Sequence, residues 1–159
     1  MDDEETLSFI REQAANTKHI FSVCTGALLL GAAGLLVGKR ATTHWAAIHL
    51  LNYFGATPSN ERVVIDGKLV SAAGVTAGID GALQVAALLC GERKAQEIQL
   101  DIQYAPEPPF DSGSVNTAPK EVVQAVRAAY QPLTDARLNT ARRIRAKLGR
   151  YLDSVAADP

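Results

Sequence analysis

The sequence has few cysteines, which limits the kinds of site that it can build. Its two cysteines, Cys24 and Cys90, are too few for a disulfide framework. There is no Cys-x-x-Cys pair and no cluster of histidines, so the spacing typical of a metal site is also missing. We therefore expect no structural metal, and we expect no cofactor.

Long apolar runs and a strong net charge are lacking as well. No apolar run reaches the length of about 18 residues that a membrane-spanning helix needs. The first residues, Met1-Asp2-Asp3-Glu4-Glu5, are acidic where a signal peptide would be basic and then apolar, which favours the cytoplasm. The net charge of −1 gives no global reason to expect a nucleic-acid partner.

Positive charge is nevertheless concentrated near the C-terminus. Residues 119–159 hold eight of the 16 Lys and Arg residues but only four of the 17 Asp and Glu residues. This segment is expected to be a basic helical tail. Contact with phosphates is one interpretation of its charge, and a solvated helix face is the favoured one.

The chain is organised around a short apolar strand that runs through a cysteine into a helix of small residues. Residues 20–23 have the pattern of a buried strand, and residues 27–33 that of a short apolar helix ended by Gly34. At such a junction the sulfur of Cys24 would face the free N–H groups of the helix, which favour the thiolate. We predict that Cys24 is a nucleophile on a nucleophile elbow; a small buried packing residue is the alternative.

The next two residues fit either interpretation of this elbow. The hydroxyl of Thr25 could bind the sulfur or a water molecule, and capping of the following helix is equally compatible. Gly26 has no side chain and lets backbone or substrate approach closely. Further along, Gly74 and Gly78 suit a second strand-to-helix crossing whose amides point at a ligand; a tight turn alone is the interpretation that the local sequence favours.

The remaining pattern alternates strands with helices, as in an α/β domain with a mostly parallel sheet. The predicted helices cover residues 4–16, 44–54 with Thr42 or Thr43 as a cap, about 79–90, and 92–103; a short strand covers 40–42, and a hairpin has strands 62–65 and 68–72 around Asp66-Gly67. A proline-rich loop over 104–119 precedes a helix from Lys120 to about Asp153, with Pro132 as a candidate break. Cys90, in an apolar helix, is expected to be inert packing.

Three motifs, taken in order, resemble those of the ThiJ/PfpI superfamily, whose members have a class I glutamine amidotransferase-like fold and carry a cysteine on a nucleophile elbow. The motifs are Cys24-Thr25-Gly26, GLLVGKRATTHW from Gly34 to Trp45, and GVTAGID from Gly74 to Asp80. The resemblance covers Asp3 to about Pro119 and implies a three-layer, flavodoxin-like sandwich. In that frame residues 1–131 are the family domain and residues 132–159 a basic helical extension.

The segment from Tyr104 to Ser114, YAPEPPFDSGS, is similar to the isocyanide hydratase branch, which converts an isocyanide to an N-substituted formamide. Too few residues follow it for the helix-turn-helix module of an AraC-type regulator, the other branch that shares the core. The resemblance implies a carbon-nitrogen lyase with Cys24 as nucleophile, a small-molecule substrate and a homodimer. A non-enzymatic protein of the same fold that senses oxidants or regulates is the alternative.

The start of the chain departs from the family. Family members place an early Asp or Glu beside the cysteine to handle the proton, whereas only 23 residues precede Cys24. We therefore expect a domain without its N-terminal third, and an activity that is weak or lost, because general acid catalysis contributes ~10²–10⁴-fold. His44 is a candidate replacement acid, with packing beside Trp45 as the favoured alternative. Besides Cys24, Thr25 and His44, the expected site includes the substrate-binding residues Gly26, Gly74, Val75 and Thr76.

Overall fold

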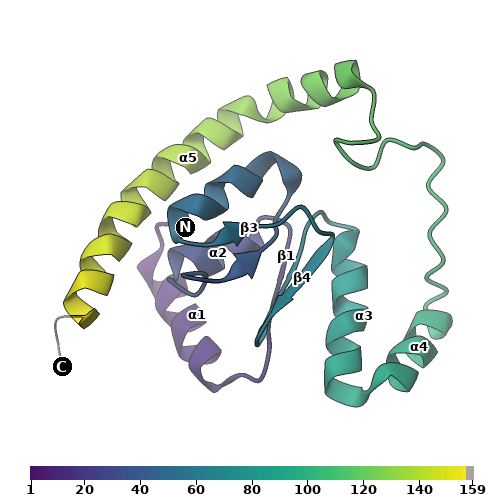
Figure 1. Cartoon of the computed structure of the whole chain (residues 1–159), viewed down its shortest axis with the longest axis horizontal. Coiled ribbons are helices and arrows are strands. Elements are labelled where there is room, and N and C mark those ends of the chain that lie inside the picture. The colour runs from purple at the N-terminus through teal and green to yellow at the C-terminus, as the bar shows by residue number, and fades with distance from the viewer. Residues whose placement is uncertain (157–159) are drawn as a thin grey trace.

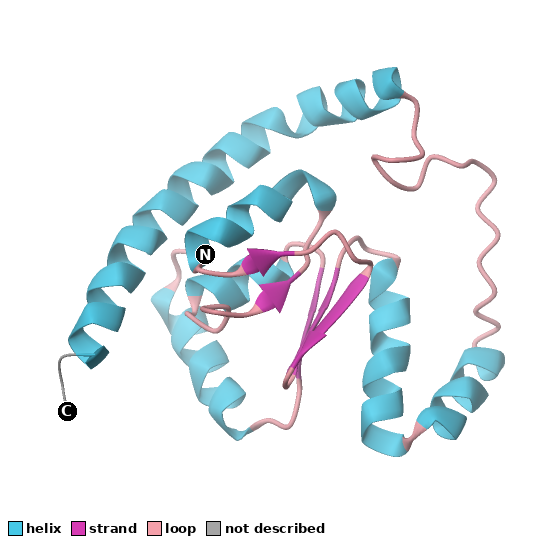
Figure 2. Cartoon of the chain, viewed as in Figure 1, coloured by secondary structure: helices cyan, strands magenta, loops and turns pink. Residues whose placement is uncertain are grey.

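The computed structural model describes the backbone of residues 1–156 and the side chains of residues 1–149. Residues 157–159 of the expected C-terminal extension lie outside this part. In chain order the elements are α1 (Glu4–Asn16), β1 (Ile20–Val23), α2 (Gly26–Ala32), β2 (Arg40–Ala41), the 3₁₀ helix η1 (Trp45–Phe54), β3 (Thr57–Pro58), β4 (Val63–Asp66), β5 (Leu69–Ala72), α3 (Ala77–Cys90), α4 (Glu92–Asp101) and α5 (Lys120–Ala156) (Figures 1 and 2).

A small mixed sheet with the strand order β1-β5-β4 lies at the centre of the fold. β1 and β5 are parallel, with Val23 opposite Ala72, and β5 and β4 form the predicted antiparallel hairpin. Gly67 in the hairpin turn has a φ of +61°, a left-handed conformation that glycine adopts without strain. β2 and β3 pair in parallel as a separate two-stranded sheet. The expected α/β fold is confirmed, and two of the three strand pairings in the described residues are parallel.

Helices cover both faces of the central sheet. Successive side chains of β1 point to opposite faces, so neighbouring residues of this strand meet different helices. Phe21 and Val23 face α3, which approaches so closely that a Cβ at Gly78 would lie 2.9 Å from Val23 and one at Gly81 2.7 Å from Phe21. Ser22 points to the other face, where α2 packs against β1. The chain therefore leaves β1 toward one face of the sheet and β5 toward the other.

The main hydrophobic core lies on the α2 side of the sheet. It joins apolar side chains of α1, α2 and η1, and Ala141 and Ile144 of α5 complete it. The largest side chains in it that are fully buried are Phe54, Leu28, Leu36, Leu50 and Leu51.

α5 runs along the outside of η1 as one long helix (Figure 1). The expected break near Pro132 is absent, since α5 is helical from Lys120 to Ala156. Contacts hold the helix on both sides of the proline: Tyr130 stacks on His44, and the Arg145 guanidinium lies 6.0 Å from the centre of the Tyr53 ring.

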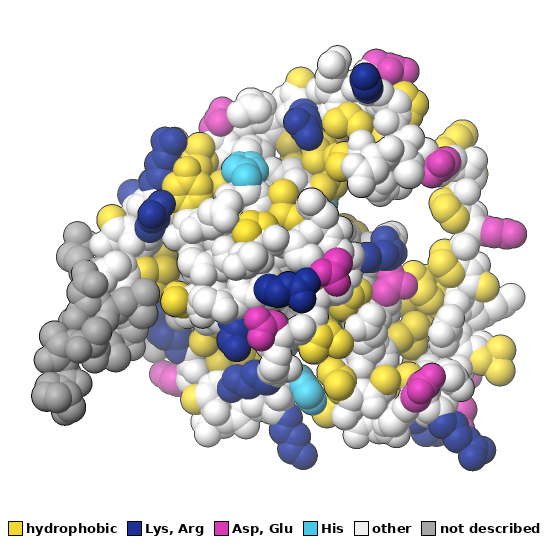
Figure 3. Space-filling model, viewed as in Figure 1, with side chains coloured by type: hydrophobic (Ala, Val, Ile, Leu, Met, Phe, Trp, Pro, Cys, Tyr) yellow, Lys and Arg dark blue, Asp and Glu magenta, His cyan; other side chains and the backbone are white. Residues whose placement is uncertain are grey.

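Part of the α3 side of the molecule remains uncovered. Within the described residues β1 pairs with a strand on one side only. Phe21 and Ile65 on the sheet are 37% and 42% exposed, and Leu88 and Leu89 on α3 are 47% and 56% exposed. Figure 3 shows hydrophobic side chains on the surface around α3 and α4. None of the helices described is both long enough and apolar enough to cross a membrane.

Candidate functional site

Cys24 occupies the turn between β1 and α2 in a strained backbone conformation. Its φ is +56°, in the left-handed region that costs a residue with a Cβ roughly 1–2 kcal/mol. Its N–H donates to the carbonyl of Ala72 at 3.0 Å and so extends the β1–β5 ladder into the turn. The side chain is half-buried. This geometry is the nucleophile elbow that the sequence predicts.

The elbow lies where the sheet changes the direction of its connections. β1 and β5 are adjacent parallel strands, and their C-terminal residues Val23 and Ala72 are in register. The chain continues from β1 into α2 on one face and from β5 into α3 on the other. In open α/β sheets, ligands bind outside the carboxyl ends of strands at such a switch point. The turn at Cys24 and the turn at Gly74 therefore lie at the same edge of the sheet.

The four residues expected to bind substrate all lie at this edge of the sheet. Gly26 is the first residue of α2, and a Cβ there would meet only the Ser22 side chain, at 3.9 Å. Gly74 faces open space, since no atom lies within 4 Å of a Cβ built on it. Val75 is 75% exposed, and Thr76 precedes the first residue of α3. These residues therefore lie at the same edge of the sheet as Cys24, and their binding of substrate stays a prediction.

Thr25 occupies the cap position of α2, yet its side chain makes no capping hydrogen bond. Its carbonyl accepts the N–H of Leu28 at 3.0 Å, which closes the first turn through the backbone instead. The capping interpretation of the Thr25 hydroxyl is therefore wrong, and interaction with the sulfur or a substrate remains a prediction.

His44 is held by α5. Its ring centre lies 5.4 Å from that of Tyr130 and 5.6 Å from that of Trp45, and its Nδ1 accepts a backbone N–H of the first turn of η1 at 3.4 Å. Burial and, after it, the positive charge of Arg137 lower the pKa of His44. Within the described residues no hydrogen bond joins His44 to the thiol of Cys24. These contacts favour the packing interpretation over a role as acid.

The second cysteine does not behave as expected. Cys90 is the last residue of α3 and is exposed, so its prediction as a packed side chain is wrong. The apolar residues before it misled the sequence analysis, because Leu88 and Leu89 are themselves partly exposed on this surface.

Thr43, predicted from the sequence only as a candidate helix cap, contacts the elbow directly. The hydroxyl of Thr43 donates to the carbonyl of Cys24 at 2.7 Å, and Thr43 is 1% exposed. The preceding residue, Thr42, donates its N–H to Oγ of Ser71 on β5 at 3.0 Å. The cap of η1 is His44 instead. No local pattern could reveal these contacts, because 19 residues separate Thr43 from Cys24.

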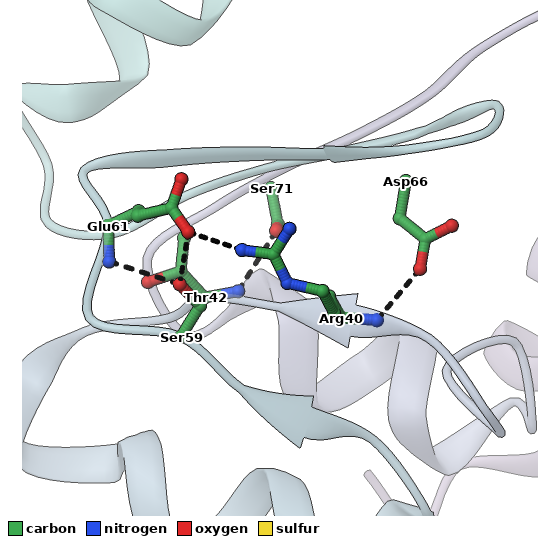
Figure 4. A network of polar contacts seen from close by, with 6 residues as sticks. All are labelled: Arg40, Thr42, Ser59, Glu61, Asp66 and Ser71. Carbon is green, nitrogen blue, oxygen red and sulfur yellow. Dashed lines mark hydrogen bonds and ion pairs between the residues drawn. The ribbon is translucent and has the colours of Figure 1, made fainter.

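The segment that leads to Thr43 is anchored at its other end, as Figure 4 shows. The N–H of Arg40 donates to Oδ2 of Asp66 at 2.8 Å, and its guanidinium pairs with Glu61. Glu61 also accepts a hydrogen bond from Oγ of Ser59 at 2.8 Å. The hydrogen bond from Arg40 is the main cause that lowers the pKa of Asp66. Residues 40–43 are therefore held at three points: Arg40 bonds Asp66 of β4, Thr42 bonds Ser71 of β5, and Thr43 bonds Cys24 at the end of β1.

A further polar cluster borders the turn at Gly74. Arg62, just before β4, pairs with Asp80 of α3 and donates to the hydroxyl of Thr76 at 3.2 Å. The hydroxyl of Tyr104 donates to the other oxygen of Asp80 at 3.0 Å. Burial opposes the charge of Arg62, but the hydrogen bonds to Asp80 and Tyr104 outweigh it and raise the pKa of the guanidinium. The cluster holds the start of the proline-rich loop against α3 and the turn before it.

Several cavities lie elsewhere in the described structure, including one of about 300 Å³ between α4 and the start of the proline-rich loop. One of about 270 Å³ is bordered by α1, the end of α2 and α5, and one of about 350 Å³ lies between η1 and α5. A smaller one, of about 110 Å³, separates Trp45 from the proline-rich loop and α5. Cys24 lines none of these cavities.

Comparison with known proteins agrees with this geometry. Residues 1–88 match the DJ-1/PfpI family. The isonitrile hydratase of Pseudomonas putida is 55% identical over 148 residues, which are 93% of this chain and 65% of that protein. The crystal structure of a THiJ/PfpI family protein from Pseudomonas syringae is similar with a TM-score of 0.85 and 44% identity, over 87% of this chain and 57% of that one.

A weaker match is to the HTH-type transcriptional regulator CdhR of Pseudomonas aeruginosa, which is 34% identical over 94 residues, 58% of this chain and 28% of that protein. The chain spans less than two thirds of the length of each of these relatives.

Proposed function

The chain belongs to the DJ-1/PfpI family, and we propose that it is an isonitrile hydratase-like enzyme in which Cys24 is the nucleophile. The observation that carries the proposal is the left-handed elbow of Cys24 at the switch point of the sheet. The identity of 55% to the isonitrile hydratase of Pseudomonas putida supports the choice of substrate class. The non-enzymatic alternative is not favoured, since its support is the shorter match to a regulator.

The proposed reaction consumes one isocyanide and one water. The terminal carbon of R–N≡C is electrophilic, so the thiolate of Cys24 adds to it while the same carbon takes up a proton. The product is the protein-bound thioimidate R–N=CH–S–Cys24. Water then adds across the C=N bond. Breakage of the C–S bond releases the formamide R–NH–CHO and returns the thiol.

Two parts of the site would stabilise charge during these steps. The first turns of α2 and α3 both lie at this edge of the sheet. The N–H groups of Leu28, Gly78 and Ile79 donate to carbonyls of the preceding turns, so among the described residues those of Gly26, Ala27 and Ala77 are left to stabilise a developing negative charge on the substrate.

The proton donor is the weak point of the site. Within the described residues no carboxylate hydrogen-bonds to the Cys24 thiol, and the contacts of His44 favour packing. We therefore expect turnover that is slow for a hydratase, because a positioned acid typically contributes ~10²–10⁴-fold.

We further propose that the protein acts on a small molecule, in the cytoplasm, as a homodimer. The one-sided pairing of β1 and the partly exposed Phe21 and Ile65, which lie on the same face of the sheet, support association with a second copy. A nucleic-acid partner is not proposed, since three arginines of α5 are engaged within the chain: Arg127 over Trp45, Arg145 over Tyr53, and Arg143 with Asp2.

Incubation with cyclohexyl isocyanide tests the proposal. The purified chain and its Cys90→Ser variant should both produce N-cyclohexylformamide, and the Cys24→Ser variant should not. Equal formamide production by all three proteins would remove the covalent mechanism.

A further inference from the structure

The peptide that carries the nucleophile is held from two sides by residues far away in the sequence. The N–H of Cys24 donates to Ala72 at 3.0 Å, and the carbonyl of Cys24 accepts the hydroxyl of Thr43 at 2.7 Å. The first bond extends the β1–β5 ladder of the sheet, and the second is made by a single side chain from a distant segment.

The direction of the Cys24 carbonyl also fixes the direction of the N–H of Thr25. Because the peptide unit is planar and trans, the N–H of Thr25 points opposite to the carbonyl of Cys24. A hydrogen bond that holds the carbonyl therefore aims this N–H as well. The amide concerned is the one that leads from the sulfur-bearing residue into α2.

Thr43 is suited to this task because its side chain is buried and the backbone before it is held in place. It is 1% exposed, so water does not compete for its hydroxyl. The residue before it is fixed to β5 through the hydrogen bond from Thr42 to Ser71. Arg40 and Asp66 fix the start of the segment in turn (Figure 4).

Thr42 supplies a built-in comparison. It is as buried as its neighbour, with no exposed surface, but its own hydroxyl has no hydrogen-bond partner within the described residues. The two adjacent threonines are both buried, but their hydroxyls differ: that of Thr43 bonds the elbow, and that of Thr42 has no partner within the described residues.

We propose that Thr43 is a positioning residue for the nucleophile, acting through the carbonyl of Cys24 to hold the elbow peptide, and with it the sulfur, in the reactive orientation. This inference rests on the proposed role of Cys24 as nucleophile and deepens it. Since the Thr43 hydroxyl bonds the carbonyl of Cys24, it should affect the step at sulfur, and therefore kcat, while KM stays unchanged.

The test uses four proteins that all carry Cys90→Ser, which removes the exposed second thiol: the parent, Thr43→Val, Thr43→Ser and Thr42→Val. Two quantities are measured: the rate constant for alkylation of Cys24 by iodoacetamide, and kcat and KM for cyclohexyl isocyanide. Thr43→Val should lower the alkylation rate and kcat by about threefold to tenfold, the change expected from one hydrogen bond. Thr43→Ser, which keeps the hydroxyl, and Thr42→Val should match the parent.

Two results would overturn the inference. One is an alkylation rate of Thr43→Val equal to that of Thr42→Val; the other is a failure of Thr43→Ser to keep the parent rate. If Thr43→Val does not fold, Thr43→Ala replaces it, and the comparison with Thr43→Ser then decides. A parent without hydratase activity whose alkylation still depends on the Thr43 hydroxyl would refute the proposed function and leave the positioning role intact.

Discussion

The hydroxyl of Tyr104 donates a hydrogen bond of 3.0 Å to Asp80, whose other carboxylate oxygen pairs with Arg62. One carboxylate thereby joins three parts of the chain: the start of the proline-rich loop, the first turns of α3, and the residue before β4. Gln99 of α4 also holds Tyr104, through hydrogen bonds of 3.0 and 3.2 Å to its backbone, and the bond to Asp80 ties the start of the loop to α3.

Removal of the Tyr104 hydroxyl should loosen the loop more than it weakens the domain. In Tyr104→Phe the free energy of unfolding should fall by about 0.5–1.5 kcal/mol, as expected for one hydrogen bond. Limited proteolysis should cleave residues 104–119 faster in this variant than in the parent. Phe110→Tyr, a change at an exposed position of the same loop, serves as the control. Unchanged cleavage in Tyr104→Phe would show that other contacts hold the loop.

The unpartnered hydroxyl of Thr42 predicts a substitution that stabilises the protein. Valine has nearly the shape of threonine and brings no buried polar group, and a buried hydroxyl without a partner costs ~1–3 kcal/mol. Thr42→Val should therefore raise the midpoint of urea unfolding or leave it unchanged. A clear decrease would mean that this hydroxyl has a partner, and the Thr42 comparison with Thr43 would lose its basis.

Two glycines of one motif should respond differently to alanine. A Cβ at Gly78 would lie 2.9 Å from Val23, whereas one at Gly74 would meet no atom within 4 Å. Gly78→Ala should destabilise the protein by about 1–3 kcal/mol, since α3 must move away from β1. Gly74→Ala should leave the unfolding midpoint close to that of the parent. Equal destabilisation by both would contradict the close packing of α3 on the sheet.

The depressed pKa of His44 predicts a loss of stability in mild acid. Burial and the charge of Arg137 lower this pKa from its usual value of 6.5, so the folded state binds fewer protons than the unfolded state. The contribution of His44 is fully present above about pH 6.5 and is lost as the pH falls below that value.

Arg137→Gln should raise the pKa of His44 and make the loss smaller. The comparison is made from urea unfolding at about pH 7.5 and about pH 5.5. Asp66 does not interfere, because its lowered pKa affects stability only below its usual value of 3.8. An acid-induced loss of the same size in Arg137→Gln and the parent would contradict the assigned cause.

The elements that the sequence predicts well are those with local signals. α1 has the helical spacing of Leu7, Ile10 and Ala14, the hairpin has its turn at Asp66-Gly67, and the elbow has a cysteine between a strand and a helix of small residues. The two-residue strand β3 carried no such signal and was missed.

Contacts between distant segments explain the remaining differences. The bond from Thr43 to Cys24 and the one from Tyr104 to Asp80 span 19 and 24 residues. Their residues stand in motifs that the sequence analysis noted, yet nothing in a single sequence says which partner each one meets. The exposure of Cys90 and the uninterrupted helix at Pro132 depend in the same way on what packs nearby.

The central claim is that the sulfur of Cys24 forms a bond to the isocyanide carbon, and mass spectrometry of an acid-quenched reaction tests it most directly. The Cys90→Ser protein, quenched during turnover of cyclohexyl isocyanide, should carry one added isocyanide, and fragmentation should place it on the peptide that contains Cys24. Formamide production without any such adduct, or an adduct that persists in Cys24→Ser, would contradict the account.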